Sequence, residues 1–244
     1  MRKEDCETLL FECKELLVQI QDQHQRDFDL RKKEITSPKL KSFLEHSRSI
    51  LEYCAGDVFD YMISEAAKLS KLQSKNKYVY FPYGNNRVSF RNSMKRNLPG
   101  LQPTHAAYKL IEGIQDYNRP SQKFLSYLCE LTNTNKHDRL SSQMRNASTT
   151  LMMPGISAEG VNGLVLRGNT YNGVDMGEVI INDEEYIVNI NPSFFSRTVL
   201  FEEGAFVFKD SQTDILQFLN VVYTSIEKFI HKFYLLLEPK TDSK

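Results

Sequence analysis

Long apolar runs are missing from the sequence. No stretch approaches the roughly 20 consecutive apolar residues that a membrane-spanning helix needs. The opening segment, MRKEDCETLLFECKELL, carries acidic side chains through its apolar stretch and has no small-residue cleavage site. It therefore predicts a helix and not a signal peptide. We expect a globular protein that has no association with a membrane.

Cysteine is scarce, and no two cysteines have CxxC spacing. Three of the four lie on the apolar faces of predicted helices, where a free thiol behaves as a small buried hydrophobe. We expect neither disulfide bonds nor a zinc site, which is typical of the reducing cytoplasm. His24, His46, His105 and His231 show no ligand spacing such as HExxH. The sequence therefore predicts no metal and no cofactor.

The sequence has no formal net charge, but its positive and negative residues are unevenly distributed along the chain. Residues 77–150 hold 11 Lys and Arg against 4 Asp and Glu, whereas residues 151–244 hold 7 against 13. The middle third is thus +7 and the last third −6, by subtraction of the counts in these segments. A basic field of this size favours an anionic partner in the middle third.

Residues 1–143 predict a mainly α-helical up-and-down bundle. Apolar residues recur at three- and four-residue steps over residues 3–33 and from Pro38, which follows a Ser/Thr cap, to about Leu72. Helical patterns return at Thr104 and Ser121, each taken as a capping hydroxyl. Between Leu72 and Thr104, the β-favouring aromatic residues near 77–91 and a GNN turn predict a short extended β excursion.

The pattern changes after residue 143. Short β-branched or aromatic runs, separated by Gly, Asn and Asp, predict an antiparallel β-meander over residues 144–210. Residues 211–238 then predict a last helix that packs back on the bundle or the sheet. The fold class is therefore α+β: a helical bundle, an antiparallel sheet and a final helix.

The segment ELTNTNKHDRLSS combines a titratable base with cations and amides. His137 lies beside Lys136 and near Arg139, with Asn133 one helical turn earlier. Imidazole exchanges protons near neutral pH, and cations stabilise the charge of a phosphoryl transition state, so the segment could serve phosphodiester chemistry. The alternative is a polar helix end whose basic side chains complement the helix dipole.

Arg48 and Glu52 are one turn apart on the second predicted helix. Residues at this spacing share a helix face, so the two side chains are expected to meet. They are either a surface ion pair, contributing about 0.3–0.5 kcal/mol, or part of one cluster with His137.

The segment YVYFPYGNNRVSFRNSMKR alternates aromatic and basic residues. Aromatic rings can stack on bases while guanidinium groups hold phosphates, the usual arrangement for single-stranded nucleic acid. The alternative is that the aromatic residues pack the segment onto the bundle. The candidate nucleic-acid-binding residues are Tyr80, Tyr83, Arg87, Arg91, Lys95, Arg96 and Arg139.

Three segments in this order, HSRSILEY, YFPYGNN and LTNTNKHDRL, resemble an uncharacterised bacterial family of helical proteins. Its members carry a helix like NLRSALDH, an extended FPI segment and a later NIDKHRRL. The resemblance covers roughly residues 38–142, including GIQDYNRP beside that family's IQPY. Arg48, Glu52, Lys136 and His137 match family positions. Asn135 stands where the family has Asp, and Asp138 separates His137 from Arg139.

A bundle with Arg and His on facing helices is similar to HEPN-type domains, many of which are metal-independent ribonucleases of toxin and defence systems. Their usual signature places His five to seven positions after Arg, and no arginine here has such a partner. The resemblance implies an RNA-directed protein that cuts by transesterification without a metal. In that role, His137 would move protons while Arg48 and Lys136 stabilise the phosphate. The candidate catalytic residues are Arg48, Glu52, Asn133, Lys136 and His137.

The competing hypothesis is a non-catalytic interaction protein. Arg48, Glu52 and His137 would then form a buried polar network that fixes the helix register. The acidic C-terminal sheet would bind a protein partner or a second copy of the chain.

Overall fold

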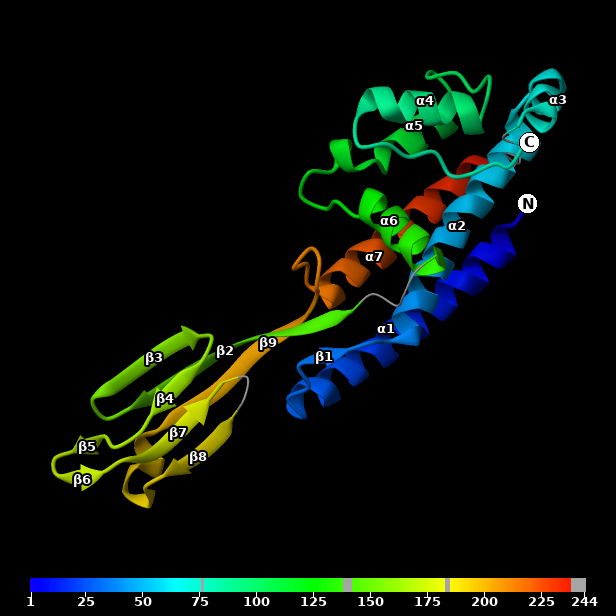
Figure 1. Ribbon diagram of the computed structural model, residues 1–244. Coiled ribbons are helices and arrows are strands. Elements are labelled where there is room, and N and C mark those ends of the chain that lie inside the picture. The colour runs from blue at the N-terminus through cyan, green and yellow to red at the C-terminus, as the bar shows by residue number, and fades with distance from the viewer. Residues whose placement is uncertain (76, 138–141, 183–184, 238–244) are drawn as a thin grey trace, which may run out of the picture. The chain divides into compact units, whose positions relative to one another are not determined.

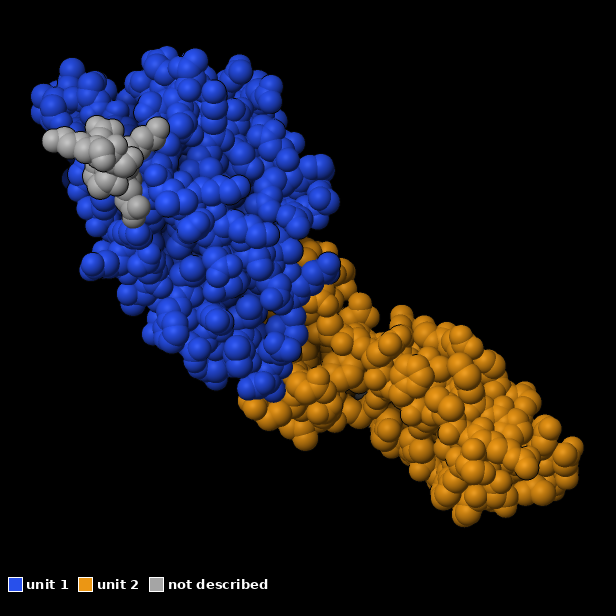
Figure 2. Space-filling model, turned by 180° about the vertical axis from the view of Figure 1, so that it is seen from behind, with its two compact units in different colours: residues 1–23, 36–141, 216–244 blue, residues 24–35, 142–215 orange. Residues whose placement is uncertain are grey.

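The computed structural model describes residues 1–75, 77–137, 142–182 and 185–237, with residues 134–137 described by their backbone alone (Figure 1). The chain forms two compact units (Figure 2). The first, here called the helical unit, comprises residues 1–23, 36–141 and 216–244. The second, the sheet unit, comprises residues 24–35 and 142–215. Mixed α+β structure with antiparallel sheets and a C-terminal helix is confirmed.

The core of the helical unit is apolar and aromatic, and α7 contributes to it. Phe229 of α7 meets Phe81 with ring centroids 5.6 Å apart, and Phe218 meets Tyr127 at 5.2 Å. Burying a side chain of this size stabilises a fold by roughly 1.5–3 kcal/mol. The helices are α1 (Lys3–Asp29), α2 (Pro38–Met62), α3 (Glu65–Gln73), α4 (Arg87–Asn97), α5 (Ala106–Gly113), the 3-10 turn η1 (Asp116–Asn118), α6 (Leu125–His137) and α7 (Ile215–Leu237).

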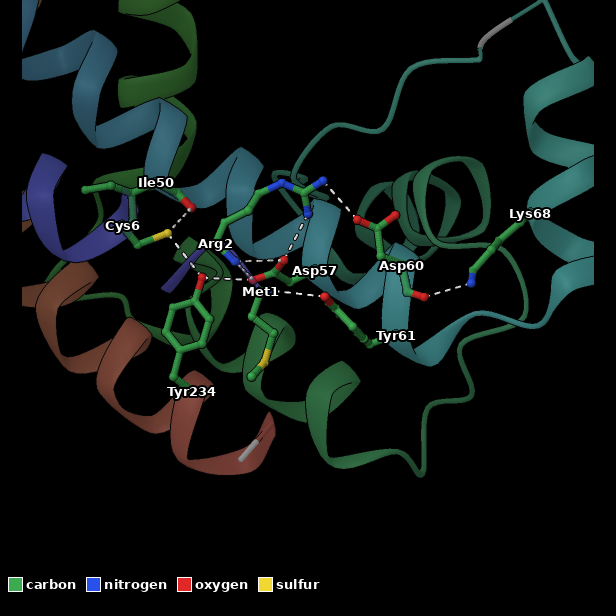
Figure 3. Close-up of polar contacts among 9 residues, drawn as sticks. All are labelled: Met1, Arg2, Cys6, Ile50, Asp57, Asp60, Tyr61, Lys68 and Tyr234. Atoms are coloured by element: carbon green, nitrogen blue, oxygen red, sulfur yellow. Dashed lines mark hydrogen bonds and ion pairs between the residues drawn. The ribbon is translucent and has the colours of Figure 1, made fainter. Parts of the chain in front are cut away.

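A buried carboxylate ties the start of the chain to α2 and α7 (Figure 3). Asp57 is fully buried and accepts hydrogen bonds from the Arg2 backbone N–H at 2.9 Å and from the Tyr234 hydroxyl at 3.0 Å. The Arg2 guanidinium pairs with the same carboxylate at 2.9 Å. Burial raises the pKa of Tyr234, so its hydroxyl remains a donor. This network holds α7 within the helical unit.

The single helix expected from Pro38 to about Leu72 is wrong. Ile63 is buried and extended, with φ −91° and ψ 138°, and Ser64 is also extended before α3 begins. The apolar period continues across this break, so periodicity alone does not reveal it. The local signals are the β-branched Ile63 and the Ser-Glu start of a new helix.

The β excursion expected near residues 77–91 is also wrong. Residues 87–97 form α4, which Asn86 caps by accepting hydrogen bonds from the backbone N–H groups of Val88 and Ser89. Ser89 returns a bond to the Asn86 backbone, completing a capping box. Residues 77–86 are irregular and extended, and in the described part of the chain they join no sheet.

The capping hydroxyls expected at Thr104 and Ser121 do not begin α5 and α6. The Nδ1 atom of His105 accepts the N–H of Ala107 at the start of α5. The start of α6 is capped by Asp116, whose carboxylate accepts three backbone N–H groups, those of residues 124, 125 and 126, at 2.8–3.0 Å. Because this cap lies eight positions before residue 124, a local sequence pattern does not show it.

In the sheet unit, the strands are antiparallel but do not follow a simple meander. β2 (Gln143–Met153) pairs with β9 (Val199–Phe208) along ten residue pairs, from Gln143↔Phe208 to Met152↔Val199. It also pairs with β3 (Ile156–Val161) and with β1 (Glu34–Ile35), which precedes the predicted sheet region. The other strands are β4 (Leu164–Leu166), β5 (Thr170–Tyr171), β6 (Val174–Asp175), β7 (Gly177–Ile181) and β8 (Tyr186–Ile190), in the sheets β4-β7-β8 and β5-β6, followed by the 3-10 turn η2 (Pro192–Arg197).

One glycine permits the β2–β9 pairing. Gly204 faces Ala147 in the register and has φ +156°. A Cβ atom there would lie 2.1 Å from the Asn146 carbonyl oxygen, so only glycine fits.

None of the helices within the described ranges is long and apolar enough to cross a membrane.

We expect Asp116→Ala to lower the free energy of unfolding by about 3 kcal/mol. The substitution leaves three N–H groups at a largely buried helix start without their acceptor. Urea denaturation of the full chain measures the loss. Asp116→Asn, which keeps one acceptor oxygen, should lose less. Asp22→Ala, at an exposed position of α1, is the control. Equal stability of the Asp116→Ala and Asp22→Ala variants would contradict the cap.

Candidate functional site

A cleft of about 840 Å³ lies within the helical unit. Its walls come from α2, α4 and α6, from residues 78–83 and from Lys71 of α3. The cleft unites two groups of residues that the sequence analysis treated separately, one as catalytic and one as nucleic-acid-binding. Six of them line it: Arg48, Glu52, Tyr80, Tyr83, Arg96 and Asn133.

Arg48 and Glu52 form a partly buried ion pair on α2. Arg48 Nε lies 2.6 Å from Glu52 Oε1, and the two side chains are 12% and 22% exposed. The second carboxylate oxygen, Oε2, accepts the backbone N–H of Phe81 at 2.6 Å. Because both oxygens are engaged, Glu52 positions the cleft wall and is poorly placed to exchange protons with a ligand.

The Arg48 guanidinium has further contacts. It lies 5.4 Å from the centre of the Tyr83 ring, and its Nη1 contacts the Cys129 sulfur. Burial lowers the pKa of Arg48, but its interactions with Cys129 and Glu52 outweigh burial and raise it. Burial raises the pKa of the Cys129 thiol to about 12, so that thiol is neutral at pH 7. Glu52 therefore supplies the counter-charge of Arg48.

Side chains, and not a neighbouring strand, hold residues 77–86 in place. Asn97 Oδ1 accepts the N–H of Tyr80 at 3.2 Å, and the amide of Gln115 bonds both the Gly84 N–H and the Pro82 carbonyl. Together with the Glu52 bond to Phe81, these contacts satisfy an irregular backbone next to the core.

This anchoring sorts the aromatic side chains of the segment into two groups. Phe81 is 1% exposed, whereas Tyr78 and Tyr80 are 64% and 53% exposed. Phe81 packs against Phe229 in the core, while Tyr78 and Tyr80 stay on the exposed side of the segment. The Tyr78 and Tyr80 rings lie 6.5 Å apart and line the cleft. They are available to stack on a planar ligand.

Two cations line the cleft beside these tyrosines. Lys71 is 6% exposed, and its pKa is lowered by burial and then by the charge of Arg96. Arg96 lies in the last turn of α4 and is exposed. A bound anion would offset the repulsion between the two positive charges.

The other predicted residues either do not line the cleft or have side chains outside the described residues. Arg87 approaches Glu112 at 3.5 Å, and neither Arg87 nor Arg91 lines the cleft. Lys95 lines a neighbouring hollow. Lys136 and His137 end α6, but their side chains lie outside the described residues, as does Arg139 altogether. The predicted approach of Arg48 to His137 therefore lies outside the described residues.

Sequence reasoning missed several cleft residues. Lys71 was not singled out, and the pattern gave no reason to separate it from the surface lysines of its helix. Ser93 and Asn97 carried a usable signal, since they are polar residues among the buried apolar positions of α4. They are 5% and 3% exposed, and Asn97 Nδ2 donates to the Ser93 carbonyl at 3.1 Å.

Within the described residues, no group of three or more His, Cys, Asp or Glu side chains is arranged to hold a metal ion. Comparison with protein families, with curated proteins and with solved structures finds no match to this chain.

We expect Glu52→Ala to lower the free energy of unfolding by about 2 kcal/mol. The change leaves the Arg48 charge and the Phe81 N–H without their partner in a partly buried place. Hydrogen exchange should also show faster exchange of the Phe81 amide. Glu45→Ala is the matched control, because Glu45 lines the same cleft but makes only a half-exposed pair with Lys41 at 3.8 Å. Unchanged exchange at Phe81 in Glu52→Ala would rule out the anchoring role.

Proposed function

We propose that the helical unit binds single-stranded RNA in the cleft between α2, α4 and α6. The observation that carries the proposal is the exposed pair Tyr78 and Tyr80 in one cleft with Lys71 and Arg96. Stacking of a base on an aromatic ring is worth about 1–3 kcal/mol, and neighbouring cations hold the phosphates between bases. The +7 balance of residues 77–150 supports the same partner class, since RNA is a polyanion.

The exposed tyrosine rings support binding of strands with different bases. Tyrosine faces stack on any base, and uncharged polar side chains of the cleft, among them Ser49, Ser93 and Asn133, can bond to base edges or phosphates. Such a site binds single-stranded nucleic acid with little preference for one base sequence. A paired helix, with its bases already stacked on one another, would leave the tyrosine rings unused.

We further propose that the bound strand is cut by transesterification, as in a metal-independent endoribonuclease of toxin or defence type with a HEPN-like bundle. Asn133 lines the cleft, and His137 follows four positions later in the same helix. His137 would take the 2′-hydroxyl proton or protonate the leaving oxygen, and Lys136 with Arg48 would stabilise the phosphate. Glu52 serves this scheme by orienting Arg48.

Binding is tested by fluorescence anisotropy with a labelled oligouridylate at about 50 mM salt. We expect the Kd of a Tyr78→Ala/Tyr80→Ala double variant to rise by tenfold or more, because two stacking faces are lost. Binding by the parent chain should weaken steeply as salt rises. Tyr53→Ala is the control, since Tyr53 is a half-exposed tyrosine of α2 outside the cleft. No binding by the parent chain would refute the proposed function.

Cleavage is tested separately with His137→Ala. We expect this variant to lose RNA cleavage and to keep both oligouridylate binding and a free energy of unfolding within about 1 kcal/mol of the parent. His137 is the last residue of α6, where substitutions cost much less than core truncations. A gel assay with the oligonucleotide, with and without EDTA, follows cleavage. Full cleavage by His137→Ala would remove the residue from the mechanism.

A non-catalytic interaction protein is the second candidate. It is favoured by Glu52, whose two oxygens bind Arg48 and Phe81 and so serve structure. Under this alternative the cleft binds RNA, or the acidic sheet binds a protein, and no strand is cut. Binding without cleavage by the parent chain separates this alternative from the nuclease.

A further inference from the structure

A second hollow, of about 420 Å³, adjoins the cleft in the helical unit. It lies between the end of α3 and the end of α4. Its positive side chains are Lys71 of α3, Lys75 shortly after that helix, and Lys95 and Arg96 of α4. Among the described residues that line it there is no carboxylate and no aromatic ring. We refer to it as the basic hollow.

The negative ends of two helix dipoles offset only part of this positive charge. α3 and α4 both end here, and each helix C-terminus carries roughly half a negative charge. Two helix ends therefore offset about one of the four positive charges that line the hollow. Positive charge from Lys75, Lys95 and Arg96 therefore remains in the hollow for a phosphate-rich group to balance.

Lys71 shows the effect of this crowding. It is 6% exposed, and its pKa is lowered by burial and by the neighbouring Arg96 charge. A phosphate placed between the two side chains would favour the charged form of Lys71 and offset the repulsion. Ser70 and Ser74 also line the hollow and bring hydroxyl groups that can donate to phosphate oxygens.

The basic hollow and the cleft share Lys71 and Arg96. The two spaces differ in what they offer a ligand. The cleft carries the exposed rings of Tyr78 and Tyr80, and the hollow carries charge without a ring. A strand passing through both would need a place for bases in the hollow. A strand that ends there needs only a place for its phosphate.

We propose that the basic hollow binds the terminal phosphate of the RNA strand whose bases lie in the cleft. This inference rests on the proposed RNA binding and deepens it from single-stranded RNA to strands with a phosphorylated end. A terminal phosphomonoester carries about −1.5 to −2 charges near pH 7, compared with one for each internal diester, so the hollow distinguishes an end from the middle of a strand. A terminal triphosphate carries more negative charge and should therefore bind the hollow more tightly.

The test compares oligouridylates of one sequence carrying a 5′-hydroxyl, a 5′-monophosphate, a 5′-triphosphate or a 3′-phosphate, by anisotropy at about 150 mM salt. We expect a strand with the preferred phosphorylated end, 5′ or 3′, to bind about tenfold tighter than the 5′-hydroxyl strand. In Lys75→Glu this gain should disappear while binding of the hydroxyl strand stays within twofold, because Lys75 lines the hollow and not the cleft. Lys109→Glu, an exposed position outside both spaces, controls for general charge.

A second measurement separates the two proposals. Calorimetric titration with inorganic tripolyphosphate should show binding to the parent chain that Lys75→Glu weakens at least fivefold and Lys109→Glu does not. Equal affinity for all four strands, or equal loss in both lysine variants, overturns the terminal-phosphate site and leaves RNA binding standing. Tripolyphosphate binding that depends on Lys75, without affinity for any strand, refutes RNA binding and restricts the hollow to a phosphate site.

Discussion

The cleft depends on the carboxylate of Glu52. One oxygen holds Arg48 and the other holds the backbone of Phe81, so a single side chain fixes both a positive charge and a cleft wall. Residues 77–86 have no sheet partner in the described chain, and their polar backbone groups depend on such side chains. Once Phe81 is anchored and buried, Tyr78 and Tyr80 remain exposed in the cleft. The exposed aromatic surface therefore depends on the Glu52 bond to Phe81, together with the bonds from Asn97 and Gln115 to the same segment.

Gln115 and Asp116 hold two further elements of the cleft wall, the segment 77–86 and α6. Gln115, fully buried, bonds Pro82 and Gly84, and Asp116 caps the start of α6. The junction between α5 and η1 therefore fixes both the extended segment and the helix that carries Asn133. Both positions fall in the segment GIQDYNRP. Its chemistry is structural: an amide and a carboxylate satisfy backbone groups that no regular element reaches.

The sequence predicts those features that depend on local pattern. The start of α2 at Pro38, the helix over most of α1 and the antiparallel strands follow from caps and periodicity. The Arg48–Glu52 contact follows from four-residue spacing. What fails depends on contacts between distant segments. The cap of α6 comes from Asp116, and β2 pairs with β9 between residues 47 to 65 positions apart. Tyr80 and Arg96 line one cleft, where Asn97 holds the backbone of Tyr80 and Glu52 holds that of Phe81. Lys71 gave no sequence signal at all.

In the proposed complex with RNA, the distribution of charge in the two spaces would give the strand a direction. On α2 the Arg48 charge is balanced by Glu52, so this side of the cleft is polar with little net charge. Lys71 and Arg96 lie where the cleft meets the basic hollow, and Lys75 and Lys95 add charge beyond them. An anionic end is therefore drawn toward the hollow, while the neighbouring bases can stack on Tyr78 and Tyr80. Under the proposed cleavage, this arrangement favours a single cut at a fixed distance from a phosphorylated end.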